Sequence, residues 1–164
     1  MYAASPCKAC AVHVVDTKCK SESSSSHGLS QPARSWCFHL SRFLFLLQIG
    51  LLTSSRADYG IYLPLLKAIM KAPDMDLGVI AFGTHLSKTH GHTVDHIVHD
   101  GFPIVKTIDT IPKDDSPLDI AESYALTAQQ FAEYWSGEGS TYDVVLALGD
   151  RYEMAAAVAA SIPF

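Results

Sequence analysis

Residues Tyr142 to Ala160 constrain the fold more than any other stretch of the chain. Five consecutive aliphatic residues at 144–148 are typical of a parallel strand that is covered on both faces of its sheet. A glycine ends this strand, and we expect Asp150 and Arg151 to open a helix. Small residues fill most of 154–160 and would let that helix pack closely against the strand. The stretch therefore predicts one strand–turn–helix unit.

Three further strand–helix units precede this one, separated by turn residues. We expect strands at 49–53, 77–82 and 104–108, helices at 63–70, 89–99 and 118–135, and the start of another strand at 161–164. Ser116 or Asp115 is expected to cap the long third helix. Hairpin signals are absent, so the alternation predicts an α/β fold with a doubly wound parallel sheet. Ligands of such sheets bind beyond the carboxyl ends of the strands, here at 54–58, 83–85 and 149–153.

Residues 1–47 differ in composition from the rest of the chain. Five serines lie between residues 21 and 26, and the surrounding residues show no apolar periodicity. All four cysteines fall in this segment: Cys7, Cys10, Cys19 and Cys37. The first two have the spacing of half a zinc site, but the second two lack the close spacing that would complete it. We therefore favour a disordered extension over a zinc site at 1–47, and place one domain at 48–164.

The chain carries 12 basic and 17 acidic residues, which gives a net charge of −5. This balance provides no electrostatic footprint for nucleic acid or for an anionic membrane surface, so neither partner is expected. The apolar run from Phe43 to Leu52 is broken by Gln48 and Gly50 and is too short for the roughly 20 residues of a membrane helix. Cysteines confined to the extension suit a reduced folded domain, and we expect a cytoplasmic protein.

Two arginines lie just after predicted strands, where the predicted sheet would bind ligands. Arg56 and Arg151 fall at or near the start of a helix, and a cation there opposes the helix dipole unless it shares an anion. Free N–H groups at helix starts bind phosphates, so an added arginine would make a diphosphate cradle. Alternatively, each arginine is a solvated surface residue or pairs with Asp58 or Glu153. Spacing alone leaves both interpretations open.

Asp150 follows the predicted strand at 144–148 and also has two interpretations. A carboxylate at the first positions of a helix accepts hydrogen bonds from free N–H groups, and this capping role is common. At the mouth of a sheet, the same carboxylate could act as a general acid or base. Sequence periodicity does not separate the two roles.

Five histidines lie between residues 85 and 99. His92 and His96 have the i, i+4 spacing of a metal clamp, but no HExxH acid lies between them, so we favour a polar helix face and expect no metal. His85 stands apart in a loop after a strand end, where an imidazole could contact a phosphate or a sugar hydroxyl. Neither a Walker loop nor a GxGxxG motif is present, so no cofactor is expected.

Four motifs match one family in their order and approximate spacing. They are Thr-Ser-Ser-Arg-Ala-Asp-Tyr-Gly at 53–60, Gly-Thr-His-Leu at 83–86, Asp-Gly-Phe at 100–102 and Leu-Gly-Asp-Arg-Tyr-Glu-Met at 148–154. With these motifs the chain resembles the hydrolysing UDP-N-acetylglucosamine 2-epimerases, and most closely the branch that makes N-acetylmannosamine for sialic or legionaminic acid. The non-hydrolysing branch usually has a threonine-rich run where this chain has residues 151–153.

The resemblance implies a glycosyltransferase-B-like architecture, in which two Rossmann-like domains hold a UDP-sugar substrate and this chain supplies part of the amino-terminal one. Such enzymes eliminate UDP across C1 and C2 and then add water to give N-acetylmannosamine. By position, Asp150 matches a catalytic carboxylate of the family, Arg56 matches the residue that faces the diphosphate, and His85 matches a histidine that lines the same cleft. Arg151 and Glu153 belong to the same motif, and we assign them to shaping the site.

Parts of the family pattern have no counterpart in the chain. The histidine and Gly-Gly-Glu segment that supplies further catalytic acids would follow Phe164, as would the second domain that normally holds the uridine. We therefore expect the chain alone to be an incomplete enzyme. The alternatives are a non-catalytic nucleotide-binding fragment and another sugar-nucleotide enzyme of the same architecture. A homo-oligomer is compatible with each of these interpretations.

Overall fold

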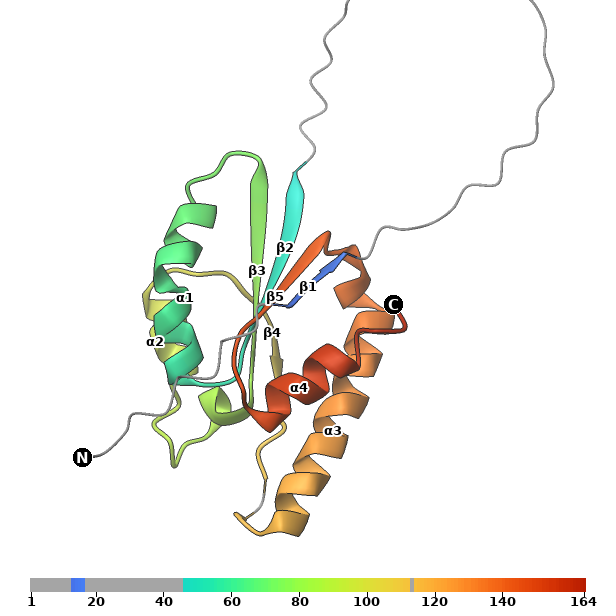
Figure 1. Ribbon diagram of the computed structural model, residues 1–164. Helices are drawn as coiled ribbons and strands as arrows, with labels where there is room; N and C mark the ends of the chain where they lie inside the picture. The colour runs from blue at the N-terminus through green and yellow to red at the C-terminus, as the bar shows by residue number, and fades with distance from the viewer. Residues whose placement is uncertain (1–12, 17–45, 113) are drawn as a thin grey trace, which may run out of the picture.

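The computed structural model describes residues 13–16, 46–112 and 114–164 (Figure 1). The four cysteines and the zinc site considered for them lie outside these ranges. In chain order the elements are β1 (His13–Asp16), β2 (Leu47–Thr53), α1 (Arg56–Ile69), β3 (Met75–Phe82), η1 (Gly83–Leu86), α2 (Val94–His99), β4 (Ile104–Ile108), α3 (Pro117–Ser136), η2 (Glu138–Thr141), β5 (Val144–Ala147) and α4 (Tyr152–Ala159).

Five strands form one sheet in the order β1-β5-β2-β3-β4. β2 pairs in parallel with both β3 and β5, and β3 pairs in parallel with β4. Because Ile49 of β2 lies beside both Leu77 and Val144, these strands run in near alignment and end at the same edge of the sheet. In Figure 1 the start of α1, η1 and the start of α4 lie together at this edge, below the sheet.

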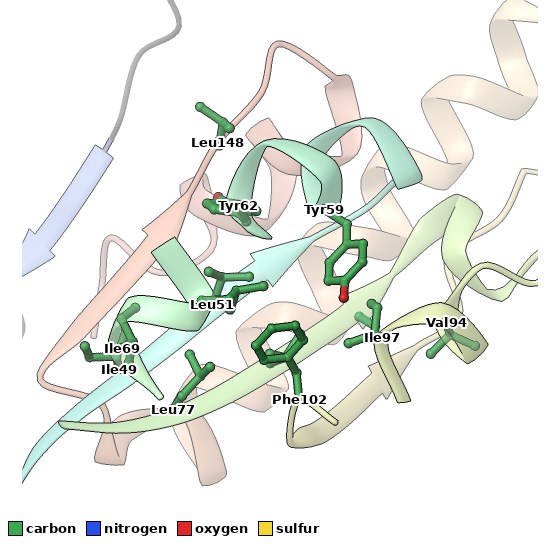
Figure 2. Packing of buried hydrophobic residues seen from close by; sticks show 13 residues of the cluster. Ile49, Leu51, Tyr59, Tyr62, Ile69, Leu77, Val94, Ile97, Phe102 and Leu148 are labelled. Atoms are coloured by element: carbon green, nitrogen blue, oxygen red, sulfur yellow. The ribbon is translucent and has the colours of Figure 1, made fainter. Parts of the chain in front are cut away.

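Different helices cover the two faces of the sheet, as a doubly wound topology requires. α1 and α2 lie on one face, and α3 and α4 lie on the other (Figure 1). β2 alternates between the two layers, since Leu51 packs with α1 and α2 whereas Leu52 packs with α3 and α4. Figure 2 shows the first layer, in which Tyr59 of α1 points toward Phe102. The predicted α/β class with a doubly wound parallel sheet is confirmed.

Close packing explains a glycine at position 50. An added Cβ at Gly50 would lie 3.0 Å from ring atoms of Tyr142, whose ring also lies against Gly78 of β3. The Tyr142 hydroxyl lies 3.0 Å from the hydroxyl of Tyr134 in α3, so the ring keeps a polar partner inside the core. The glycine therefore makes room for an aromatic residue that joins β2 to the helix layer.

Two strand predictions differ from the structure. β1 lies within residues 1–47, for which no regular element was expected, and it pairs antiparallel with β5 from His13 beside Ala147 to Asp16 beside Val144. Four residues are too few to show a reliable periodic pattern. Residues 161–164 form turns rather than a new strand, because Ser161 N–H donates to Val158 O and Phe164 N–H donates to Ser161 O.

None of the helices in the described part of the chain is both long and apolar enough to cross a membrane.

The packing predicts a large cost for truncating Phe131. This side chain is fully buried in the α3 and α4 layer, and its ring centroid lies 4.9 Å from that of Phe82. Phe131→Ala should lower the free energy of unfolding by about 3–5 kcal/mol, because it removes an aromatic contact and leaves a cavity. Leu126→Ala on the same helix is the control, since Leu126 is 41% exposed and should cost below about 1 kcal/mol. Urea unfolding measures both, and equal losses would contradict this packing.

Candidate anion-binding site

Hydrogen bonds join the turns that follow β2 and β3. Thr53 at the end of β2 shares a hydrogen bond of 2.9 Å between its Oγ1 and Nε2 of His85. Thr84 in η1 donates through Oγ1 to the carbonyl oxygen of Ser54, at 2.8 Å. These two contacts bring the first two sequence motifs together although they lie some thirty residues apart.

The third motif is joined to the first through Tyr59. Its hydroxyl donates to Oδ2 of Asp100 at 2.5 Å, and its ring packs edge to face against Phe102. This hydrogen bond stabilises the charged form of Asp100 and lowers the pKa of that carboxyl below its usual value. The Asp-Gly-Phe motif therefore anchors α1.

Asp58 fixes the start of α1. Its Oδ2 accepts hydrogen bonds from the backbone N–H groups of Ser54 and Ser55, each at 3.1 Å, and from the Ser54 hydroxyl at 2.8 Å. Ser55 completes a capping box by accepting from the Asp58 N–H. The Asp58 carboxylate is thus used by the turn and does not pair with Arg56, which removes one of the alternatives considered for that arginine.

A hollow of about 340 Å³ opens at the carboxyl edge of the sheet. We call it the arginine hollow, and its lining residues are Ser55, Arg56, Ala57, Thr84, His90, Thr93 and Arg151. Within the described residues, the exposed Arg56 has neither a hydrogen-bond nor an ion-pair partner. The hollow thus brings two guanidinium groups together, and such a pair of donors suits an anion.

A buried carboxylate orients the side chain of Arg151. Its Nε contacts Oε1 of Glu153, whose side chain is 3% exposed. Glu153 lies close to Gly83, since an added Cβ there would lie 3.6 Å from its Cγ. Because the contact uses Nε, the two terminal nitrogens of Arg151 remain available at the hollow. The predicted pairing of Arg151 with Glu153 therefore exists, and it leaves anion binding possible.

Asp150 lies outside the helix that it was expected to open. α4 begins at Tyr152, and the capping position is taken by Arg151 without any side-chain hydrogen bond. Gly149 precedes Asp150 and has φ +130°, a backbone conformation that residues other than glycine rarely adopt. The Asp150 side chain is exposed and accepts no hydrogen bond from the part of the chain that the structure describes. The capping interpretation is therefore not supported, and Asp150 is left facing solvent beside the hollow's Arg151.

His85 is buried behind the hollow and does not line it. It is 0% exposed, and its two ring nitrogens share hydrogen bonds with Thr53 and, at 2.8 Å, with Thr93. Burial lowers its pKa to about 4, so the ring is neutral near pH 7. In this arrangement His85 has no free nitrogen for a phosphate or sugar hydroxyl, and it acts on the hollow through Thr93.

Sequence reasoning missed His90, which it placed on a polar helix face. α2 begins only at Val94, because Gly91 at φ +86° and His92 at φ +46° adopt left-handed backbone that ends any helical path. His90 therefore sits in a loop and lines the hollow. His92 lies outside the helix as well, so it cannot form a helical clamp with His96. Within the described residues, no group of three or more metal-binding side chains occurs.

A second hollow, of about 360 Å³, lies between β4 and the end of α3. Its lysine, Lys106, is already paired with Glu138 at 3.2 Å, and Glu133 adds a further carboxylate to the lining. None of the four motifs contributes to this hollow. We therefore regard the arginine hollow, which is smaller but contains two arginines, as the candidate site.

The sequence model of one family, UDP-N-acetylglucosamine 2-epimerase, matches residues 67–163. The chain belongs to the UDP-N-acetylglucosamine 2-epimerase family. The matched region contains η1 and the strand–turn–helix unit that carries Asp150 and Arg151, and Arg56 precedes it. Membership supports an enzyme of sugar-nucleotide metabolism.

Two bacterial proteins are similar to this chain in sequence. The polysialic acid biosynthesis protein P7 of Escherichia coli is 36% identical over 111 residues, which are 67% of this chain and 28% of that protein. A UDP-N,N'-diacetylbacillosamine 2-epimerase (hydrolyzing) of Legionella pneumophila is 37% identical over 110 residues, 67% of this chain and 29% of that protein. The chain thus spans less than a third of the length of these relatives.

A solved structure of a UDP-N-acetylglucosamine 2-epimerase has the same fold. It superimposes with a TM-score of 0.58 at 17% sequence identity, over 71% of this chain and 30% of that protein. The likeness supports the expected Rossmann-like sheet in the part of the chain that superimposes.

The buried His85 makes stability depend on pH. Its pKa is about 4 in the folded chain and takes the ordinary value of 6.5 when unfolded. Below pH 6.5 the unfolded chain binds a proton that the folded chain does not, so the free energy of unfolding falls until pH 4 is reached. The loss from this group approaches about 3 kcal/mol. Glutamine does not titrate in this range. On acidification the free energy of unfolding of His85→Gln should therefore fall by about 3 kcal/mol less than that of the parent.

Urea unfolding at intervals from pH 7 to pH 4.5 measures this difference. His96→Gln is the matched control, because His96 is exposed on α2, and its curve should follow that of the parent chain. Parallel curves for His85→Gln and the parent would show that His85 is not held neutral by burial.

Proposed function

We propose that this chain is part of a hydrolysing UDP-N-acetylglucosamine 2-epimerase, and that the arginine hollow binds the diphosphate of the UDP-sugar. The observation that carries the proposal is the convergence of Arg56 and Arg151 on one hollow from the starts of two separate helices. Two guanidinium groups match the charge of a diphosphate, and Arg56 is not neutralised by the nearby Asp58.

The proposed reaction has two steps. A base removes the proton from C2 of the sugar while the C1–O bond breaks, and UDP leaves with the electron pair, so that a glycal forms. Water then adds across the double bond, with its hydroxyl on C1 and a proton returned to C2 from the opposite face, which gives N-acetylmannosamine. In this scheme the arginines stabilise the charge of the departing diphosphate.

Asp150 is proposed as an acid–base group for proton transfer at the sugar. It directly precedes Arg151, which faces the hollow, so a sugar attached to a diphosphate bound there would lie within its neighbourhood. Its carboxylate has no hydrogen-bond donor among the described residues and is exposed, so it is free to exchange a proton.

A diacetamido sugar nucleotide is the second candidate substrate. The Legionella relative at 37% identity is named for UDP-N,N'-diacetylbacillosamine. The same elimination and hydration would apply to that sugar, so the chemistry proposed for the hollow is unchanged. Comparing turnover of the two UDP-sugars decides between them.

Removal of Arg56 should weaken binding of UDP. Arg56→Ala deletes a charged donor, and hydrogen bonds to charged groups contribute about 1.5–3 kcal/mol, which corresponds to roughly tenfold to hundredfold weaker binding. Lys88→Ala is the control, because Lys88 is an exposed cation of a nearby loop that does not line the hollow. NMR titration of the chain with UDP measures both affinities. Equal affinities for the parent and Arg56→Ala would count against the proposed diphosphate site.

The role of Asp150 is tested by turnover in the complete enzyme. Asp150→Asn should lower the rate by about two to four orders of magnitude, because the amide cannot exchange the C2 proton, while the fold stays intact. The matched control is Asp115→Asn in the exposed loop before α3. Proton NMR with UDP-N-acetylglucosamine in deuterated water follows free UDP and N-acetylmannosamine labelled at C2. Binding of UDP without any such product would favour a non-catalytic nucleotide-binding protein.

A further inference from the structure

The order of the strands sets the order of the side chains along the arginine hollow. Arg151 follows β5, Arg56 follows β2, and His90 follows β3 and η1. Because β2 lies between β5 and β3 in the sheet, the strand order implies that Arg56 lies between Arg151 and His90 along the hollow that all three line. The hollow therefore has a donor side chain at each end and a third between them.

The ring of His90 is set by two neighbouring hydroxyl groups. Nδ1 lies 2.8 Å from Oγ of Ser87 and 3.2 Å from Oγ1 of Thr89, and these two oxygens are 2.7 Å apart. If Thr89 donates to Ser87 and Ser87 donates to Nδ1, both hydroxyl protons are used. Nδ1 is then an acceptor, and the ring carries a proton on Nε2. Among the described residues Nε2 has no partner, so it can donate to a ligand.

The loop that carries His90 is held at both ends. The His92 N–H donates to the Ser87 carbonyl oxygen at 2.9 Å, which closes the turn. Thr93 shares its hydroxyl hydrogen bond with the fully buried His85, which ties the far end of the loop to the sheet. His90 is therefore positioned before a ligand arrives, and binding does not have to order the loop.

We propose that His90 makes the arginine hollow selective for a diphosphate over a single phosphate, by donating from Nε2 to the phosphoryl group farther from Arg151. This inference rests on the proposed binding of a UDP-sugar. A single phosphate meets its strongest partners, the two guanidinium groups, without reaching the His90 end of the row. A diphosphate has two phosphoryl groups, so one can bind between the arginines while the other extends to His90.

The test compares inorganic pyrophosphate with inorganic phosphate in NMR titrations of the whole 164-residue chain. His90→Ala should weaken binding of pyrophosphate about tenfold, since it removes one hydrogen bond to a charged group, and should change binding of phosphate by less than about twofold. His90→Gln should recover most of the pyrophosphate affinity, because its amide can donate from a position close to that of Nε2. His96→Ala, an exposed histidine away from the hollow, should behave as the parent.

Two outcomes separate this inference from the proposed function. If Arg56→Ala weakens pyrophosphate binding while His90→Ala leaves the preference for pyrophosphate unchanged, the selectivity proposal is wrong and the diphosphate site stands. If the parent chain binds neither ion, the diphosphate site itself is wrong and both proposals fail. Equal weakening of phosphate and pyrophosphate by His90→Ala would also contradict the proposal, because His90 would then act on any anion.

Discussion

Parallel pairing of β2 with both β3 and β5 is the constraint on which the rest of the structure depends. Parallel strands that are paired side by side end at one edge, so the turns after them meet there whatever their separation in the sequence. Arg56, His90 and Arg151 are brought to one hollow in this way. The same pairing leaves both faces of the sheet apolar, and the four helices cover them.

Buried polar groups then fix the turns in place. Asp58 satisfies the donors at the start of α1, and His85 joins Thr53 to Thr93, so two of the turns are held by hydrogen bonds that solvent does not reach. Glu153 does the same for Arg151. Some residues of the sequence motifs thus hold the turns in place through buried hydrogen bonds. Others have side chains that line the hollow.

The sequence was sufficient for the parallel strands of the sheet and for part of the site, but not for β1. Aliphatic runs bounded by glycine and polar turns located the parallel strands, and the rule that ligands bind at their carboxyl ends selected Arg56 and Arg151. It did not distinguish His85, which is buried, from His90, which lines the hollow, because one depends on tertiary hydrogen bonds and the other on left-handed backbone at 91–92. The acid–base role of Asp150 stays a prediction, since exposure beside the hollow is compatible with it and does not establish it.

The wide spacing of the three donor side chains along the chain affects how the protein acquires its site during folding. Arg56 and Arg151 come close only after β2 has paired with β5 across nearly a hundred residues, and such distant contacts form late and slowly. No isolated helix or loop of this chain can carry the hollow. An anion that binds there stabilises the fully paired sheet alone, so adding it should slow global unfolding more than it accelerates the early steps of folding.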